Sequence, residues 1–252
     1  MIVLFTDFGV AGPYVGQMKA VLAHRAPGVP VIDLMHDAPA FDPQPAAYLL
    51  ASLLDHVPAD AVVCAVVDPG VGGDRPPVAV RADGRWLVGP GNGLFEIVRR
   101  RARTATVERL TLDTGALSAT FHGRDLFAPA AAALALGQTV PAAPIDGPLP
   151  GADWPDDLAH VIYIDGYGNA MTGLRAAAIG PQAAVSVAGQ RLDHARTFTD
   201  VPAGRPFWYA NSQGLVEIAV NRGDAADTLA LAIGSPIAVD DPRNAPIHPR
   251  SP

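Results

Sequence analysis

The chain has 252 residues, of which 49% are hydrophobic and 17% are charged, and its formal net charge at pH 7 is −7. This composition is typical of a globular protein with room for one large or two modest domains, and it excludes a disordered chain. The negative charge also argues against a general nucleic-acid binder, which needs a basic face for the phosphate backbone.

The first half of the chain alternates strand and helix patterns. We expect strands over Ile2–Thr6, Val29–Leu34 and Ala61–Val67, helices over Tyr14–Ala26, Pro45–Val57, Asn92–Arg101 and Arg124–Leu136, and a hairpin formed by Val78–Arg81 and Trp86–Val88. The continuous apolar run Ala61–Val67 is typical of a parallel strand that is buried on both faces. Residues 1–140 are therefore predicted to form an α/β domain with a mainly parallel sheet.

The pattern changes after Gly137. Residues 141–155 are rich in Pro and Gly and lack periodicity, which predicts a linker. Short β-type runs follow at Val161–Ile164, Ala183–Val187, Phe207–Tyr209, Leu215–Val220 and Thr228–Ile233. No amphipathic helix is visible among them, so residues 156–239 are predicted to be all-β. Residues 240–252 contain four prolines and are predicted to be a flexible tail.

Cysteine usage and hydropathy predict a cytoplasmic protein that does not contact membranes. Cys64 is the only cysteine and lies inside a Val-rich run, which favours a buried neutral thiol over a nucleophile. The apolar start Met1–Phe5 is too short for a signal peptide, and no apolar stretch approaches the roughly 20 residues that span a bilayer.

Polar residues gather where the predicted strands and helices end. Asp7 ends the first strand, Asp68 and Arg75 lie in the Gly-rich segment after Ala61–Val67, and His122 precedes a predicted helix. Ligands bind at the carboxyl ends of strands in open α/β sheets, where a carboxylate, a guanidinium and an imidazole could together activate water. Taken singly, each residue has an ordinary interpretation as a turn, capping or surface residue.

Two loops of the second half carry further candidates. Asp165–Asn169 places glycines on both sides of an aromatic residue, so it could stack a ring under a base while the amide contacts the edge of the base. It fits a hairpin turn with an Asx bend equally well. Asn211–Gly214 is either a polar turn between strands or a clamp for a carboxylate.

Seven segments occur in order at sensible spacing: Thr6–Gly9, Tyr14–Lys19, Asp68–Gly72, Gly91–Leu94, His122–Ala130, Ile164–Asn169 and Asn211–Val220. Together they resemble the S-adenosyl-L-methionine (SAM) hydroxide adenosyltransferases, which are SAM hydrolases related to the fluorinating and chlorinating SAM enzymes. The resemblance extends from Met1 to about Ile233. It implies an α/β domain, a C-terminal β-barrel-like domain, and a homotrimer that binds SAM at subunit interfaces.

The resemblance also implies a reaction, in which water or hydroxide attacks the ribose C5′ of SAM and releases adenosine and L-methionine. No cofactor or metal takes part. Asp68, Arg75 and His122 would hold and activate the water, whereas a halide pocket replaces them in the halogenases. The implied substrate contacts are Asp7 with the ribose hydroxyls, Phe41 with the nucleoside, Asp165 with the methionine ammonium, Tyr167 and Asn169 with adenine, and Ser212 with the methionine carboxylate.

The chain departs from the family pattern at two positions. Gly12 stands where relatives usually have an acid before Pro-Tyr-Val-Gly, and Gly91 stands where they often have Asp, so two carboxylates near the ligand are missing. Two other functions remain open from the residues alone. One is a metal-dependent phosphoesterase that uses Asp7, Asp68, His122 and Asp125 as ligands. The other is a non-catalytic sensor of SAM or adenosine.

Overall fold

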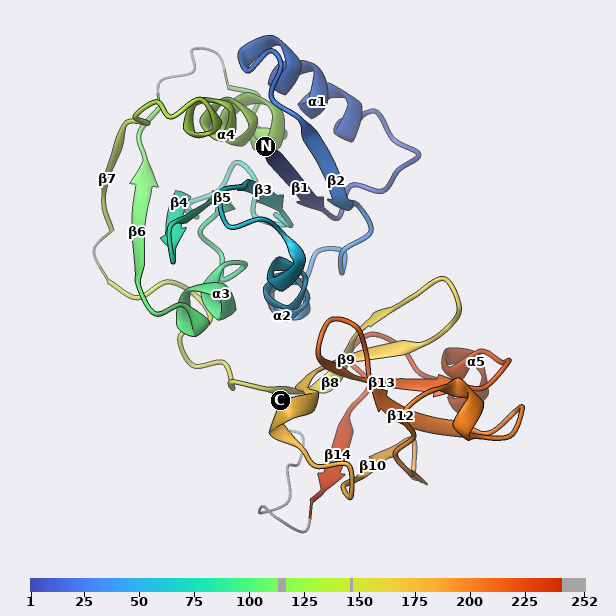
Figure 1. Cartoon of the computed structure of the whole chain (residues 1–252). Helices are drawn as coiled ribbons and strands as arrows, with labels where there is room; N and C mark the ends of the chain where they lie inside the picture. Colours follow the sequence, from blue (N-terminus) through green and yellow to red (C-terminus); the bar gives the residue numbers. More distant parts are fainter. Residues whose placement is uncertain (113–116, 146, 242–252) are drawn as a thin grey trace. The chain divides into compact units, whose positions relative to one another are not determined.

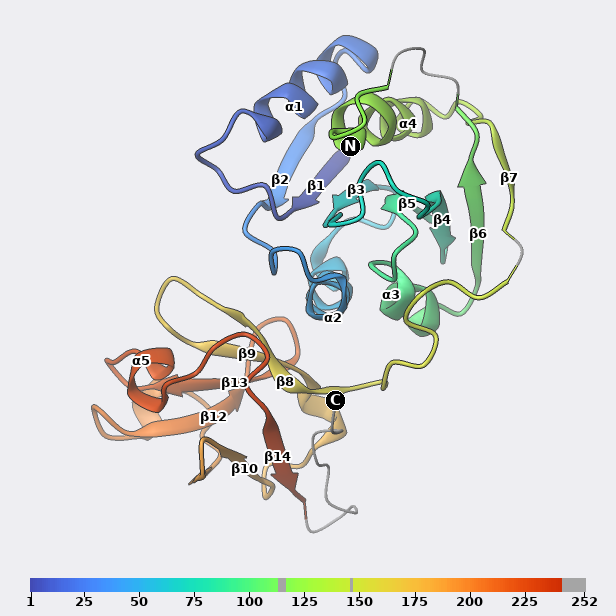
Figure 2. The ribbon, with the colours of Figure 1, turned by 180° about the vertical axis from the view of Figure 1, so that it is seen from behind.

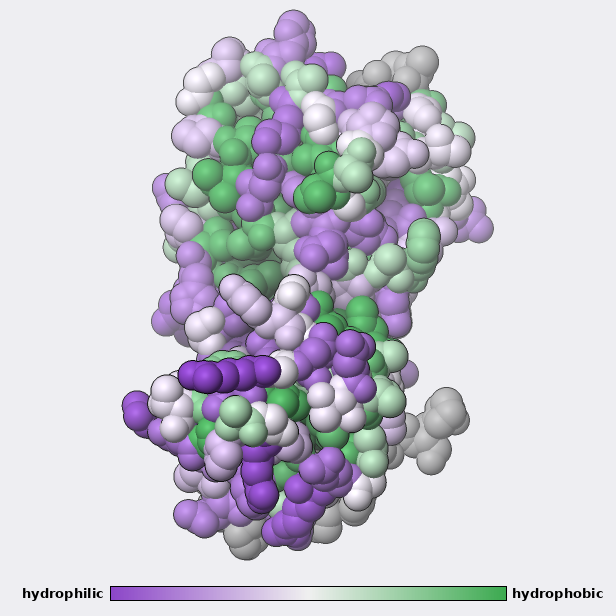
Figure 3. Space-filling view, turned by 90° about the vertical axis from the view of Figure 1, so that its right-hand side faces the viewer, coloured by the Kyte–Doolittle hydropathy of each residue, from purple (hydrophilic) through white to green (hydrophobic). Residues whose placement is uncertain are grey.

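The structure is a computed structural model that describes residues 1–112, 117–145 and 147–241. The chain divides into two compact units, Met1–Asp153 (unit 1) and Trp154–Pro252 (unit 2), and each has a hydrophobic core of its own. On the face that Figure 3 shows, polar and apolar side chains mix on the surface of each unit. None of the helices in the described ranges is both long and apolar enough to cross a membrane.

Unit 1 contains a seven-stranded sheet in the order β2-β1-β3-β5-β4-β6-β7 (Figure 1). The pairs β1–β2, β1–β3 and β3–β5 are parallel, and the remaining pairs are antiparallel. The strands are β1 (Ile2–Thr6), β2 (Val31–Met35), β3 (Val62–Val66), β4 (Pro77–Ala82), β5 (Arg85–Pro90), β6 (Ala105–Leu110) and β7 (Ala142–Pro144).

Helices cover both faces of this sheet, with α1 and α4 on one face and α2 and α3 on the other (Figures 1 and 2). The helices are α1 (Tyr14–Arg25), α2 (Pro43–Leu53), α3 (Glu96–Arg101) and α4 (Ala128–Ala135), with the short turns η1 (Leu54–His56) and η2 (Gly123–Phe127). The predicted α/β domain with a mainly parallel centre is confirmed. Cys64 is buried in β3, and burial raises its thiol pKa to about 12, which makes it inert as a nucleophile.

Two predictions for unit 1 need correction, and one strand was missed. The helix predicted from Asn92 begins at Glu96, because residues 91–95 form turns in which the Asn92 side chain donates to the Val67 carbonyl at 2.9 Å. Strand β6 was not predicted. The segment 141–155, predicted as a linker, contains β7, which pairs with β6 at the edge of the sheet.

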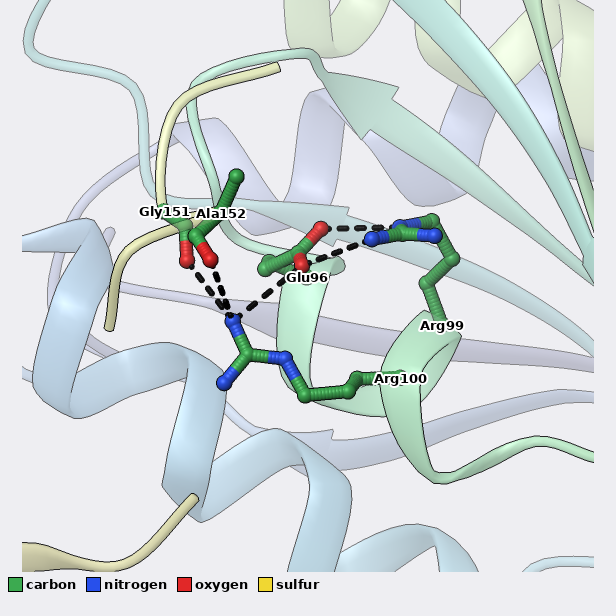
Figure 4. A network of polar contacts seen from close by, with 5 residues as sticks. All are labelled: Glu96, Arg99, Arg100, Gly151 and Ala152. Atoms are coloured by element: carbon green, nitrogen blue, oxygen red, sulfur yellow. Dashed lines mark hydrogen bonds and ion pairs between the residues drawn. The ribbon is translucent and has the colours of Figure 1, made fainter. Parts of the chain in front are cut away.

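An ionic cluster around the buried Glu96 anchors the end of unit 1 on α3 (Figure 4). The Arg99 guanidinium donates to both carboxylate oxygens of Glu96 at 2.8 Å. Arg100 donates to Glu96 at 3.3 Å and to the carbonyls of Gly151 and Ala152 at 3.0 and 3.2 Å. The charge of a buried carboxylate is thus neutralised, and the chain segment that ends unit 1 is fixed against the helix.

Unit 2 contains two antiparallel sheets, of four and three strands, in the orders β12-β13-β9-β8 and β11-β10-β14. The strands are β8 (Leu158–Ile164), β9 (Ala170–Arg175), β10 (Ala184–Val187), β11 (Gln190–Leu192), β12 (Pro206–Ala210), β13 (Leu215–Val220) and β14 (Ile237–Asp240). Short 3₁₀ turns η3 (Ala176–Ala178) and η4 (Phe198–Asp200) connect some of them.

The all-β prediction for unit 2 holds except at one place. Residues 228–233, predicted as a strand, belong partly to the short helix α5 (Ala225–Leu229), because Asp224 caps it by accepting a hydrogen bond from the Asp227 N–H at 2.8 Å. Strands β9, β11 and β14 were not predicted. The predicted tail begins at Asp240, which is the last residue of β14, and residues 242–252 lie outside the described ones.

Candidate functional site

Two loops of unit 1 meet after the carboxyl end of β3. The first follows β3 and contains Asp68, the glycines and Arg75, and the second leads to His122. Gly72 has a φ of +79°, and a Cβ on it would lie 2.4 Å from the Ala119 carbonyl oxygen. Only glycine therefore allows the first loop to pack this closely on the second.

Arg75 joins the two loops. Its Nε donates to both oxygens of Asp68 at 2.8 and 3.0 Å, and its Nη2 lies 2.8 Å from Nδ1 of His122. The Arg75 and Asp68 side chains are nearly buried, and the guanidinium lies 5.5 Å from the centre of the Phe127 ring. The predicted convergence of a carboxylate, a guanidinium and an imidazole is present, with Arg75 in the middle.

The contact with Arg75 determines which nitrogen of His122 carries the proton. A guanidinium only donates, so Nδ1 accepts and the neutral ring is protonated on Nε2. Burial, and then the positive charge of Arg75, lower the His122 pKa below its ordinary 6.5, although Asp68 and Asp125 act in the opposite direction. At neutral pH the ring is therefore uncharged and offers an N–H from Nε2.

His122 lies at the N-terminal cap of η2, which is a single π-helical turn. Such turns occur often at functional sites. Gly123 packs tightly here, since a Cβ on it would lie 3.2–3.3 Å from Phe121, Met18 and Phe8. Asp125 is bonded by the Arg124 side chain and by the Ser118 N–H at 2.9 Å, so its carboxylate supports the loop.

Asp7, directly after β1, and Phe41, just before α2, are linked to each other. Oδ2 of Asp7 accepts the Phe41 N–H at 3.1 Å. Burial raises the Asp7 pKa, and the negative charge of nearby Asp68 contributes in the same direction. Phe41 has a φ of +61° and is 78% exposed. A bulky residue in this strained conformation, with its ring in solvent, is typical of a ligand-contacting position.

His36, a buried histidine that the sequence analysis did not single out, supports the segment around Asp7. Nδ1 of His36 lies 2.8 Å from the Thr6 hydroxyl, and the His36 carbonyl accepts the Gly9 N–H at 2.6 Å. Nε2 of His36 lies 3.1 Å from Asp33. The only sequence signal was that His36 follows a predicted strand, as Asp7 and Asp68 do.

In unit 2, Asp165 organises the turn between β8 and β9. Its carboxylate accepts the N–H groups of Tyr167 and Asn169 at 2.8 and 2.9 Å and the Asn169 side-chain amide at 3.0 Å. This is the hairpin turn with an Asx bend. Tyr167 is 82% exposed, and Asn169 is buried. The turn therefore presents an aromatic ring to solvent, and the predicted stacking role remains a prediction.

The turn between β12 and β13 contains Ser212. Asn211 shapes it, because its Oδ1 accepts the N–H groups of Gln213 and Leu215 at 3.0 and 2.9 Å. Sequence reasoning missed the polar side chains of Glu217 and Tyr209, which lie on the adjoining strands. The available signal was a glutamate in the middle of the apolar run Leu215–Val220, which is buried along its whole length.

A metal centre finds no support in the described parts of the chain. They contain no group of three or more His, Cys, Asp or Glu side chains that could hold a metal ion. Among the ligands proposed for a phosphoesterase, Asp68 is bonded by Arg75 and Asp125 by Arg124.

Comparison with known proteins gives concordant results. Family models described as the SAM hydroxide adenosyltransferase N-terminal and C-terminal domains match residues 2–143 and 159–238. The chain is 46% identical to an (R)-S-adenosyl-L-methionine hydrolase of Thermus thermophilus, over 92% of this chain and 96% of the relative. It is 40% identical to a protein of the same name from Salinispora arenicola, over 93% and 95%.

Two solved structures resemble this protein along nearly their whole length. One is an uncharacterized conserved protein from Thermotoga maritima, with a TM-score of 0.84 and 27% identity over 95% of this chain and 99% of that one. The other is a conserved hypothetical protein from Thermus thermophilus, with a TM-score of 0.73 and 39% identity over the same shares.

Proposed function

The chain belongs to the SAM hydroxide adenosyltransferase family, and from this premise we propose that it hydrolyses SAM to adenosine and L-methionine. The observation that carries the proposal within the structure is the Asp68–Arg75–His122 arrangement. It offers N–H donors from a guanidinium and an imidazole beside nearly buried carboxylate oxygens. Such a set can hold one water molecule and stabilise negative charge on its oxygen.

The proposed step is a displacement at carbon. The water oxygen attacks C5′, the C5′–S bond breaks, and its electron pair stays on sulfur, which becomes the neutral thioether of methionine. The leaving group therefore needs no general acid. The water loses one proton, and the positive charge of Arg75 favours this loss by stabilising hydroxide character.

The tautomer of His122 refines its proposed role. Since Nδ1 accepts from Arg75, the Nε2–H is the group available to the nucleophile, and it can orient the oxygen as a donor. Asp68 retains lone pairs that can accept the water proton, because each carboxylate oxygen accepts more than one hydrogen bond. Asp7, Phe41, Asp165, Tyr167, Asn169 and Ser212 are the proposed substrate contacts, in the roles that the family resemblance implies.

The decisive experiment incubates the purified protein with SAM in ¹⁸O-labelled water and separates the products by chromatography. We expect adenosine with the label on its 5′-hydroxyl and equimolar methionine. We also expect the same rate with EDTA, because the proposal includes no metal and no cofactor. Label at any other position would contradict attack at C5′. Loss of activity with EDTA would instead favour a metal-dependent enzyme.

A non-catalytic sensor is the second candidate. It would bind SAM in calorimetry and leave it intact during the same incubation. The complete Asp68, Arg75 and His122 set favours the enzyme, because binding SAM without reaction does not need a carboxylate, a guanidinium and an imidazole bonded together.

We further propose a cytoplasmic homotrimer in which two subunits build each site. The proposal is supported by family membership and by the distribution of candidate residues over unit 1 and unit 2.

A further inference from the structure

His36 is a buried imidazole that the proposed chemical step does not use. It directly follows β2, which lies beside β1 in the sheet (Figure 1), and it is 6% exposed. Its Nδ1 lies 2.8 Å from the Thr6 hydroxyl, and its Nε2 lies 3.1 Å from Oδ1 of Asp33. Burying a ring with two polar nitrogens costs free energy that an apolar side chain would avoid. These two contacts offset that cost, so they indicate what the residue does.

The two contacts determine the tautomer of the ring. A lone pair on Nε2 would face the Asp33 carboxylate, so Nε2 carries the proton, although this contact lacks the alignment of a normal hydrogen bond. Nδ1 therefore accepts from the Thr6 hydroxyl. The hydroxyl oxygen in turn accepts the Phe8 N–H at 3.3 Å. The imidazole thus holds the side chain at the end of β1 in one orientation.

Backbone hydrogen bonds join the same two segments. The Gly9 N–H donates to the His36 carbonyl at 2.6 Å, and the Ala38 N–H donates to the Thr6 carbonyl at 3.1 Å. Gly9 has a φ of +69°, a conformation that glycine adopts without strain. Asp7 lies between Thr6 and Gly9, so both ends of the segment that carries its carboxylate are fixed to residues 36–38.

The segment after His36 also contacts the Asp7 carboxylate itself, because Oδ2 accepts the Phe41 N–H at 3.1 Å. The remaining lone pairs of the carboxylate can accept two further hydrogen bonds. Hydroxyls on neighbouring carbons, as in ribose, offer two donors at a fixed spacing. A carboxylate displaced by about 1 Å would lose the alignment with such a pair. Selection of a diol therefore depends on how firmly Asp7 is held.

We propose that His36 is a positioning residue that makes the site selective for a nucleoside with both ribose hydroxyls. Its imidazole holds the Thr6 hydroxyl, and thereby keeps the neighbouring Asp7 carboxylate where it accepts from the 2′- and 3′-hydroxyls together. The inference rests on the proposed function, which assigns the ribose contact to Asp7. Because His36 is buried, it acts through Asp7 and not on the ligand. A nucleoside without the two hydroxyls gains nothing from it.

The test is calorimetry with two probes that differ only in the ribose hydroxyls, adenosine and 2′,3′-dideoxyadenosine. H36L removes the acceptor for the Thr6 hydroxyl, whereas H36N keeps one, because an asparagine Oδ1 can take the place of Nδ1. T6V removes the hydroxyl at nearly constant shape, whereas T6S keeps it. The matched control is S52A, which removes a buried hydroxyl that donates to the Leu49 carbonyl at 2.8 Å, in the last turn of α2.

We expect H36L and T6V to weaken adenosine binding about tenfold, while 2′,3′-dideoxyadenosine binding stays within about twofold. H36N and T6S should keep adenosine binding within about threefold of the wild-type value. S52A should change the binding of neither probe. In SAM hydrolysis, H36L and T6V should raise KM about tenfold and leave kcat within about threefold, because a ribose contact acts in the ground and transition states alike.

Equal weakening of both nucleosides, or a loss in T6S as large as in T6V, would overturn the inference, because His36 would then only maintain the fold. A wild-type protein that binds both nucleosides equally would overturn it too. All binding is measured below the unfolding transition of each variant, and T6V decides the matter if H36L does not fold. Failure of the proposed function is separate, because it would appear as absence of adenosine from SAM with the wild-type protein.

Discussion

At the scale of single residues, Arg75 matters most to the proposed water site, because its guanidinium bonds the carboxylate of Asp68 and the imidazole of His122 at once. Lysine keeps the charge but lacks the planar fork that makes both contacts. We expect R75K to lower kcat about a hundredfold while KM for SAM changes less than about threefold. Steady-state kinetics on both parameters check this. A raised KM with unchanged kcat would instead assign Arg75 to substrate binding.

The pH dependence should follow His122, since protonation of Nδ1 would break its contact with Arg75. The pKa of His122 is lower in the folded protein than in the unfolded chain. As pH falls, the unfolded chain therefore takes up this proton at a higher pH than the folded protein does. The contact with Arg75 thus stabilises the fold above pH 6.5. That stabilisation is lost as pH falls through the lowered pKa. We expect kcat to fall along an acid limb with a midpoint below 6.5. In H122N this limb should disappear from a kcat profile, and its persistence would show that another group titrates.

The two glycines that depart from the family pattern differ in the space around them. A Cβ at Gly91 would lie 2.8 Å from the Pro76 carbonyl oxygen and 2.8 Å from Val78, whereas at Gly12 it would make ordinary contacts with Tyr14 at 3.4 Å. We therefore expect G91D to cost about 2 kcal/mol or more of unfolding free energy. G12D should stay within about 0.5 kcal/mol. Urea unfolding measures both, and equal costs would contradict the packing argument.

Site residues could be predicted from the sequence where a reactive polar residue directly follows a predicted strand, as Asp7 and Asp68 do. The supporting residues could not. His36 and Glu217 reach their positions through pairing with distant segments, and a single sequence does not reveal that a polar side chain in an apolar run faces another polar group.

At the scale of elements, long runs with one clear period were predictable. Strands β1, β3 and β13 and helix α1 lie within a residue or so of their expected bounds. Strand β7 could not be predicted, because its three residues lie among prolines and form a strand only by pairing with β6. The last two residues of helix α5 were read as the start of a strand, because residues 229–233 are apolar. The cap at Asp224 outweighs that local preference.

The same cap gives an element-scale prediction. Asp224 accepts the Asp227 N–H at 2.8 Å, and the Gly168 carbonyl accepts the N–H groups of Ala225 and Ala226 at 3.1 and 2.9 Å. D224A should lower the unfolding free energy by about 1 kcal/mol, while D224N, which can still cap the helix, should cost less than half of that. Thermal or urea unfolding of the two variants compares them. Equal losses would show that the negative charge, and not the hydrogen bond, is what stabilises this end of α5.

At the scale of the whole molecule, the candidate residues lie in two units with separate cores. Asp68, Arg75 and His122 belong to unit 1, and Asp165 and Ser212 belong to unit 2. If each site of the proposed trimer combines unit 1 of one subunit with unit 2 of another, two inactive variants can complement each other. We choose H122A and D165A, one from each unit.

Mixing these variants at equal amounts under conditions that exchange subunits should restore about a quarter of wild-type activity, because a shared site is intact only when both its contributing units are unmodified. A site built within one chain would stay inactive in every mixture. The control is a mixture of H122A with R75K, which both alter unit 1 and should not complement beyond the residual activity of R75K. Sedimentation at the assay concentration should show a trimer, and an active monomer would contradict the shared site whatever the mixtures give.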